Sequence, residues 1–151
     1  MPTLFSGGCA CGAIRYECSA APLLPMNCHC RDCQRASGSA YAALLHVPVA
    51  AFTLTRGTLK YHRRTGESGN TLDRGFCPEC GSPVVIQGQR LSSLGLLSLW
   101  AASLEDPSWF RPAMDLFVLS AQPWDFMNPA LRKFERTPTD EQARELLTVR
   151  G

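Results

Sequence analysis

The chain has 151 residues, which is enough for one domain with its own core and too few for two ordinary ones. Its 45% hydrophobic and 19% charged residues are usual for a globular protein and argue against a disordered chain. The longest strongly apolar stretch, residues 94–104, is shorter than the roughly 20 residues that a membrane helix needs. We therefore expect a single domain over residues 1–151 and no membrane partner.

The cysteine content sets the expected compartment and chemistry. The first 12 residues lack a basic segment followed by an apolar one, so a secretion signal is not expected and the predicted location is the cytoplasm. Because that compartment keeps thiols reduced, the eight cysteines favour metal or redox chemistry over a disulfide framework.

The formal net charge of +2 does not predict a nucleic-acid partner. Seven clustered thiolates would add seven negative charges and two zinc ions four positive ones, which leaves the net charge at −1. No nucleic-acid partner is therefore expected, and the oligomeric state stays open.

Short strands separated by turns dominate the pattern. Residues 12–18 alternate, with Ile14, Tyr16 and Cys18 on one face, so Cys18 is interpreted as a small buried hydrophobe. Further strands are predicted over residues 40–47, 52–55, 58–62, 71–76, 83–87, 91–100 and 114–120. This succession indicates a mainly antiparallel β domain.

Two short helices are also predicted. The first covers residues 32–37, directly after the middle cysteines, and ends at Gly38, which suits the left-handed position past a helix end. The second covers residues 140–149, where Thr139 and Gln142 form a capping-box pattern.

The motif FCPECG contains Cys77 and Cys80 and is typical of a zinc knuckle. Its tight turn directs both sulfurs to one point, and Gly81 tolerates the positive φ that lets the chain leave. A knuckle supplies two of four ligands, and the motif GCACG offers Cys9 and Cys11 as the second pair. These four thiolates would make a closed, structural zinc site.

A redox dithiol or a disulfide is the alternative for these pairs. A thioredoxin-like C-x-x-C begins a helix, whereas Cys80 is followed by Gly81, Pro83 and a β-rich run. The spacing therefore favours a structural metal.

The motif CHCRDC can place the sulfurs of Cys28, Cys30 and Cys33 on a second metal, and the sequence offers no obvious fourth ligand nearby. Three protein ligands and an open position are typical of a reactive zinc. The open position would accept water or a thiol, which zinc keeps deprotonated.

His29 and Cys18 offer alternative ligand positions. His29 is adjacent to two ligands, so its ring is expected to point away from their metal, although ligation stays an alternative. Cys18 is a weaker alternative, and His46 and His62 are interpreted as structural or exposed.

Three arginines lie near the clusters in the sequence. Arg15 is close to the first cluster, and Arg31 and Arg35 flank the second. Their guanidinium groups would balance thiolate charge or hold a substrate carboxylate.

These motifs resemble those of the glutathione-dependent formaldehyde-activating enzymes, a family grouped with centromere protein V. The resemblance continues weakly through residues 103–107 and 123–125 and covers about residues 5–135. The stretches that carry it are Gly8-Cys9-Ala10-Cys11-Gly12 with Ile14-Arg15-Tyr16, Cys28-His29-Cys30-Arg31-Asp32-Cys33-Gln34 with Gly38, and Phe76-Cys77-Pro78-Glu79-Cys80-Gly81.

The resemblance implies a mainly β fold of several small antiparallel sheets pinned by zinc, sometimes called a β-tent. It implies two zinc ions, the second of which can be partly occupied, with the same division of ligands. It also implies reversible addition of glutathione to formaldehyde. One departure is Asp115, in a stretch where many relatives are expected to have histidine.

Three functions were considered. The first is a zinc-dependent carbon–sulfur lyase that adds a small thiol to an aldehyde through Cys28, Cys30 and Cys33. The second is a non-catalytic zinc module for a protein or nucleic-acid partner, whose surface would use exposed aromatics, with the candidates Trp100, Trp109, Trp124 and Phe126. The third is a redox switch at CHCRDC that releases zinc upon oxidation.

Overall fold

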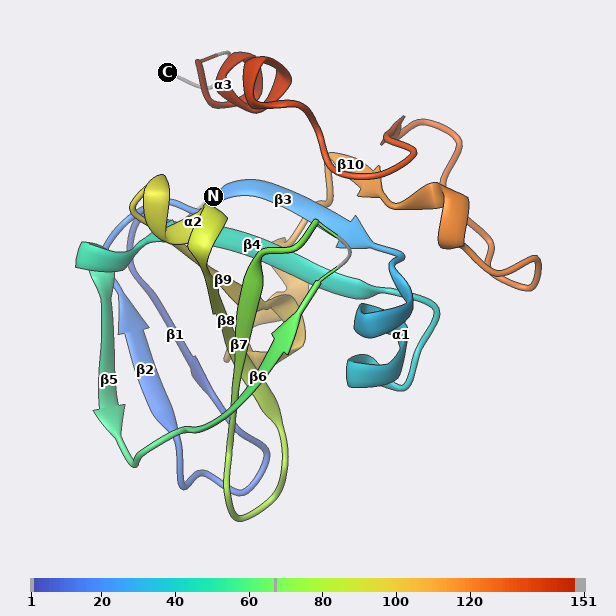
Figure 1. Cartoon of the computed structure of the whole chain (residues 1–151). Coiled ribbons are helices and arrows are strands. Elements are labelled where there is room, and N and C mark those ends of the chain that lie inside the picture. Colours follow the sequence, from blue (N-terminus) through green and yellow to red (C-terminus); the bar gives the residue numbers. More distant parts are fainter. Residues whose placement is uncertain (1, 67, 149–151) are drawn as a thin grey trace. The chain divides into compact units, whose positions relative to one another are not determined.

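The computed structural model describes residues 2–66 and 68–148 and shows a mainly β protein with a few short helices (Figure 1). The chain forms two compact units. The first unit combines Met1–Pro22 with Leu45–Phe110, and the second combines Leu23–Leu44 with Arg111–Gly151. Strand β4 (Ala42–Pro48) carries the chain from the second unit into the first.

The first unit contains a three-stranded antiparallel sheet in the order β1-β2-β5, seen on the left of Figure 1. The predicted alternation in β2 is confirmed, because Tyr16 and Cys18 are buried and Glu17 is exposed. The Tyr16 hydroxyl lies 2.8 Å from Oγ of Ser103. A side chain at Gly7 would collide with this ring, which explains a glycine in the middle of β1. The strands are β1 (Phe5–Gly8), β2 (Arg15–Cys18) and β5 (Phe52–Arg56).

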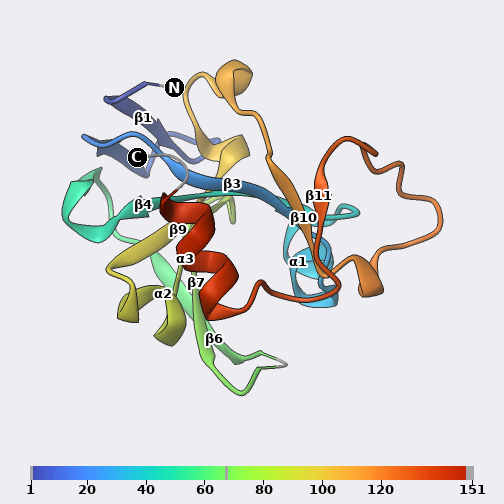
Figure 2. The ribbon, with the colours of Figure 1, turned by 90° about the horizontal axis from the view of Figure 1, so that it is seen from above.

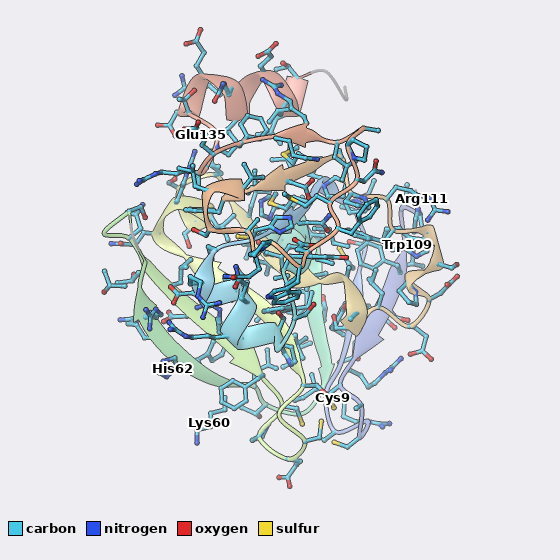
Figure 3. All side chains as sticks on the ribbon, turned by 90° about the vertical axis from the view of Figure 1, so that its right-hand side faces the viewer. Cys9, Lys60, His62, Trp109, Arg111 and Glu135 are labelled. Carbon is cyan, nitrogen blue, oxygen red and sulfur yellow. The ribbon has the colours of Figure 1, made fainter. Side chains whose placement is uncertain are left out.

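The first unit also contains an antiparallel run of strands in the order β9-β8-β7-β6. Apolar residues of β8 and β9 are buried in the core, whereas every residue of β6 is exposed. Figure 3 shows Lys60 and His62 of β6 pointing outward, and an exposed lysine at an edge strand discourages pairing with another chain. The bounds are β6 (Lys60–Thr65), β7 (Thr71–Phe76), β8 (Pro83–Gly88) and β9 (Leu96–Trp100).

The second unit contains three strands that lie side by side in Figure 2. Strand β10 (Met114–Leu116) pairs in parallel with β3 (Leu23–Cys28) and with β11 (Arg132–Lys133). Leu116 is the partner of Cys28, so this pairing brings the segment after β10 to the second cysteine motif. The sheets of the protein are thus mostly antiparallel, with a parallel portion here.

Two helices of the second unit were predicted. Helix α1 (Arg31–Ser37) ends at Gly38, whose φ of 65° confirms the left-handed position. Helix α3 (Asp140–Thr148) begins with the expected capping box, because the Thr139 amide donates to Gln142 and the Gln142 amide donates to Oγ1 of Thr139. The predicted last residue, Val149, lies outside the described residues.

Four strand predictions were wrong in extent. Residues 91–93 belong to helix α2 (Gln89–Ser93), and Gly95 at φ 68° reverses the chain before β9. Phe117 at φ 56° ends β10 early, and a 3₁₀ turn follows at Val118–Ser120. Residues 12–14 form a turn, and β6 begins only at Lys60.

Short 3₁₀ turns complete the structure. They lie at Val49–Ala51, Ala101–Ser103, Pro107–Trp109 and Val118–Ser120. Over residues 2–66 and 68–148, no helix has the length and hydropathy to cross a bilayer.

Candidate metal centres

The first cluster consists of Cys9, Cys11, Cys77 and Cys80, and the structure brings all four together in the first unit. Cys9 directly follows β1 and Cys77 directly follows β7, so two strand ends place the cluster. In Figure 1 the turns after these strands reach the same end of the unit, and Figure 3 shows Cys9 there. The four sulfurs all lie within 4.8 Å of one another.

The sulfur geometry of the first cluster fits a zinc ion. Sγ of Cys11 lies 3.6 Å from Sγ of Cys9 and 3.8 Å from Sγ of Cys77. A tetrahedral site with Zn–S bonds of about 2.3 Å separates its sulfurs by about 3.8 Å, whereas a disulfide requires about 2.05 Å. None of the eight cysteines forms a disulfide. The donor set therefore suits a closed, four-sulfur metal site.

Backbone groups and one serine hold the first cluster. The Ile14 amide donates to Sγ of Cys9 at 3.2 Å, and Gly81, at φ 76°, closes the knuckle turn by donating to the Cys77 carbonyl at 2.9 Å. The Ser82 hydroxyl accepts from the Ala10 amide at 3.1 Å and lies 3.2 Å from Sγ of Cys80. The serine thus connects the two sequence-distant halves of the site.

Hydrogen bonds change the pKa values of these thiols in different directions. The side chain and amide of Ser82, with the Cys11 amide, lower the pKa of Cys80 to about 5. Burial raises the pKa of Cys9, but the Ile14 amide and neighbouring thiols outweigh it and the net pKa is lowered. At Cys11, the Ala13 amide lowers the pKa, but Cys9, burial and the other thiols raise it to about 12. The site thus favours thiolate at some positions before any metal charge acts.

The second cluster consists of Cys28, Cys30 and Cys33, whose sulfurs lie within 4.8 Å of one another in the second unit. Cys28 ends β3, Cys30 caps α1, and Cys33 lies in the first turn of α1, where its amide donates to Sγ of Cys30 at 3.3 Å. The neighbouring thiols Cys30 and Cys33, followed by burial, raise the pKa of Cys28. Within the described part of the chain, no further cysteine, histidine or carboxylate joins this group.

The His29 ring points away from the second cluster, as the sequence indicated. Its Nε2 lies 3.0 Å from Oδ1 of Asp115, and its Nδ1 lies 2.8 Å from Oδ2 of Asp125. The second contact lacks the alignment of a hydrogen bond, so we describe it as a short electrostatic contact. The His29 side chain is 1% exposed. Because both ring nitrogens face carboxylates, His29 does not contribute to the cluster.

Asp115 is the centre of this buried polar group. Besides His29, its carboxylate accepts from Nδ2 of Asn27 at 3.1 Å and from Nζ of Lys133 at 2.7 Å. Burial raises the pKa of Asp115, but the hydrogen bonds from Lys133, His29 and Asn27 outweigh it and hold the pKa below its usual value. The aspartate that departs from the expected histidine therefore anchors the residue between two cysteines of the second cluster.

Gln34 of α1 connects the turn at His29 to the segment that follows β10. Its Nε2 donates to the His29 carbonyl at 2.7 Å and to the Ser120 carbonyl at 2.9 Å, and its Oε1 accepts from Gln122 at 3.2 Å. Arg31 also donates to this oxygen. The segment after β10 is thus tied to α1.

The polar partners of His29 and Gln34 were not predicted from the sequence. Asp115 stands out in the sequence only as a departure from the family and Asp125 only within the weak resemblance over residues 123–125, whereas Lys133 and Gln122 carry no signal. Asp115 lies 86 positions from His29, and no local spacing links the two. The one available signal is a histidine between two candidate ligands, because a ring that points away from their metal needs polar partners elsewhere.

The other candidate residues have ordinary roles. Cys18 is buried outside both groups of sulfurs, and Nδ1 of His46 lies 2.7 Å from the Ser98 hydroxyl. His62 is exposed on β6, and Arg15 pairs with Glu105 at 2.6 Å.

The aromatic candidates differ in exposure. Trp100 is buried, contrary to its interpretation as a surface residue, and Trp109 packs its ring edge against Phe5. Trp124 and Phe126 are exposed.

Comparisons with known proteins identify the family. Residues 4–120 match the family described as glutathione-dependent formaldehyde-activating enzyme. A comparison with curated proteins gave no match. The chain is also similar to a crystal structure of a Rhodobacter sphaeroides protein, with 25% sequence identity, a TM-score of 0.49, and coverage of 66% of this chain and 87% of that chain. Because the family match spans most of the sequence and includes all three cysteine motifs, the chain belongs to the family of glutathione-dependent formaldehyde-activating enzymes.

Proposed function

We propose that this protein is a zinc-dependent carbon–sulfur lyase-like enzyme that adds a small, glutathione-like thiol to an aldehyde such as formaldehyde. One observation carries the proposal: three sulfurs of the second cluster converge, and the described residues bring no fourth cysteine, histidine or carboxylate to them. A zinc ion held there would keep a substrate thiol deprotonated at neutral pH.

The two cysteine clusters and the residues around His29 would have separate roles in this reaction. Cys28, Cys30 and Cys33 would hold the reactive zinc, and the first cluster would hold a structural one. Asp115 and Asp125 keep the His29 ring turned away, so that the imidazole does not occupy the open position. Gln34 fixes the backbone between the ligands through the His29 carbonyl.

The proposed reaction is balanced without a redox partner. A bond forms between the thiol sulfur and the carbonyl carbon, and the π electron pair moves to oxygen. The oxygen takes up one proton for the one that the thiol gives up. Eight cysteines in a chain of 151 residues without a disulfide suit a reducing compartment, and we propose the cytoplasm.

The test is the exchange rate between glutathione, formaldehyde and their adduct, measured by NMR on the zinc-loaded protein. The wild type and the Cys18→Ser control should exchange faster than buffer, whereas Cys30→Ser should fall to the buffer rate. An unaccelerated wild type with two bound zinc ions would remove the enzymatic function and favour a non-catalytic zinc module.

A further inference from the structure

The two cysteine clusters differ in how far their side chains are open to solvent. Cys11 and Cys80 of the first cluster are exposed. In the second cluster, Cys28 and Cys33 are buried and Cys30 is intermediate in exposure. A metal keeps its cysteine ligands deprotonated, and the thiolate is the form that an oxidant attacks once it can reach the sulfur. The difference in exposure therefore points to the first cluster as the one that an oxidant in solution reaches.

Two buried sulfurs lie next to the exposed thiol of Cys11. Its Sγ is 3.6 Å from Sγ of Cys9 and 3.8 Å from Sγ of Cys77, so a small movement brings either one into bonding distance. The sulfur of Cys80, in contrast, lies 3.2 Å from the Ser82 hydroxyl, which does not form disulfides. An oxidised Cys11 would therefore have a second thiol beside it at once.

The turn that carries Cys11 has room to make this movement. Ala10 is also exposed, and a Cβ built on Gly12, which has φ 82°, would meet no atom within 4 Å. This end of the first unit, where Figure 3 labels Cys9, therefore borders open space at the turn. A side chain of the knuckle restrains the turn, because Oγ of Ser82 accepts from the Ala10 amide at 3.1 Å.

We propose that Cys11 is an oxidation site, at which hydrogen peroxide converts two ligands of the first cluster into a disulfide and frees the metal of that cluster, while the second cluster keeps its own. The inference goes beyond the proposed function, because it needs no thiol or aldehyde substrate at the second cluster. It also assigns the redox sensitivity to the first cluster and not to CHCRDC, for which the sequence raised a redox switch.

The oxidation takes place in two steps. Sγ of Cys11 attacks one oxygen of hydrogen peroxide, the O–O bond breaks, and a sulfenic acid forms. Sγ of Cys9 or Cys77 then attacks Sγ of Cys11, the S–O bond breaks, and a disulfide forms. Each step releases one hydroxide, which takes a proton from the solvent and becomes water. The two thiolates together lose the two electrons that the peroxide gains.

Loss of two thiolates is incompatible with a closed zinc site. A structural zinc takes four protein ligands, and after oxidation the first cluster has two thiolates left. The ion should therefore dissociate, and the first unit should become less stable, because structural zinc contributes directly to folding. A thiol reductant cleaves the disulfide by exchange, so that the site can be reloaded.

The first experiment counts zinc and maps thiols in the zinc-loaded wild type after treatment with hydrogen peroxide. A chromogenic chelator should report release of one zinc ion per chain, and native mass spectrometry should show that the other is retained. Alkylation and peptide mapping should find a disulfide that contains Cys11, with Cys28, Cys30 and Cys33 still reduced. Reductant and fresh zinc should restore both ions.

Three variants test the same inference through the rate of zinc release. Cys30→Ser, which should hold zinc only at the first cluster, should release it at the wild-type rate. Ser82→Ala removes the hydroxyl that restrains the Ala10 amide, so release should become about fivefold faster. Ser93→Ala is the control, because it removes another serine hydroxyl of the first unit, bonded within α2, and should leave the rate unchanged.

Several results would overturn the inference. One is a disulfide that does not contain Cys11, and another is earlier loss of the ion of the second cluster. A third is retention of both ions at a peroxide concentration that oxidises free glutathione. Equal release rates in Ser82→Ala and Ser93→Ala would overturn the part played by the turn at Cys11. The proposed function is judged separately, because the exchange of glutathione and formaldehyde is measured without peroxide.

Discussion

Asp115 holds three polar side chains together in the second unit. Its buried carboxylate is shared by His29, Asn27 and Lys133. Asp115→Ala leaves these donors without their acceptor, and removal of one partner of a buried charged pair costs about 3–5 kcal/mol. We expect a decrease of this size in the free energy of unfolding, measured by urea denaturation of the zinc-loaded protein.

The control for Asp115 is the exposed ion pair of Arg63 with Asp73. Nε and Nη2 of Arg63 donate to the two oxygens of the Asp73 carboxylate at 2.8 and 2.9 Å. Arg63→Ala should lower stability far less, because water screens exposed pairs. Similar losses in both variants would mean that burial of Asp115 does not govern its contribution.

His46 makes the stability of the first unit depend on pH. Burial, followed by the charge of Arg90, lowers the pKa of His46 to about 4, against about 6.5 in an unfolded chain. The unfolded chain therefore takes up a proton first as the pH falls. The contribution of neutral His46 to stability is complete above pH 6.5 and is lost as the pH falls towards 4.

We expect the wild type to lose about 1 kcal/mol more than His46→Gln between pH 7.5 and 5.5, measured by urea denaturation at each pH. Glutamine can still accept from the Ser98 hydroxyl but does not titrate. His62→Gln, at an exposed position on β6, should follow the wild type. Parallel slopes for wild type and His46→Gln would contradict the assignment to His46.

The candidate metal ligands were predictable from sequence because the spacing within each motif is local. Each of the three motifs places two or three sulfurs a few residues apart, and the structure brings together the two groups that the sequence indicated. The partners of His29 were not predictable, because they come from strand pairing and from a loop far along the chain. Local patterns carry no information about such contacts.

Among the elements, α1 holds the second cluster together, and its end depends on one residue. Gly38 has φ 65°, and a Cβ there would meet no atom within 4 Å. Gly38→Ala should therefore lower the free energy of unfolding by about 1–2 kcal/mol through backbone strain alone. Gly38→Asn should cost less, because asparagine tolerates this conformation.

The Gly38 variants also test how α1 supports metal binding. Urea denaturation gives the stability, and competition with a chromogenic chelator gives the zinc affinity of the second cluster. Weaker zinc binding in Gly38→Ala than in Gly38→Asn is expected. Equal stability of the two variants would show that strain at this position is not the cause.

The helices were predicted better than the strands, for a physical reason. A cap or a C-terminal glycine acts within one turn, so α1 was found with its C-terminal end and α3 with its beginning. Strand β3 was missed, because five of its six residues are buried and leave no alternation to detect. The segment 91–100 was assigned wholly to a strand, because its apolar run continues from α2 into β9.

At the scale of the whole molecule, the two clusters should contribute separately to metal content. We expect two zinc ions per chain by native mass spectrometry. Cys77→Ser should lose one and unfold the first unit at lower temperature, because structural zinc contributes directly to folding. Cys30→Ser should lose the other and leave hydrogen exchange of β7 and β8 unchanged.

Cys18→Ser is the matched control for the metal count, because Cys18 is buried but belongs to neither cluster. It should retain both ions. Loss of both ions in Cys30→Ser, or of none in Cys77→Ser, would contradict the division of ligands.

The interleaved order of the two units has a consequence for synthesis. The CHCRDC turn leaves the ribosome 86 residues before Asp115, which is roughly 4–17 s at 5–20 residues per second. During that interval Cys28, Cys30 and Cys33 have been synthesised. Asp115 and Asp125, whose carboxylates contact His29 in the folded protein, have not. The turn can therefore meet a metal ion before the contacts that hold the His29 ring away from the cysteines can form.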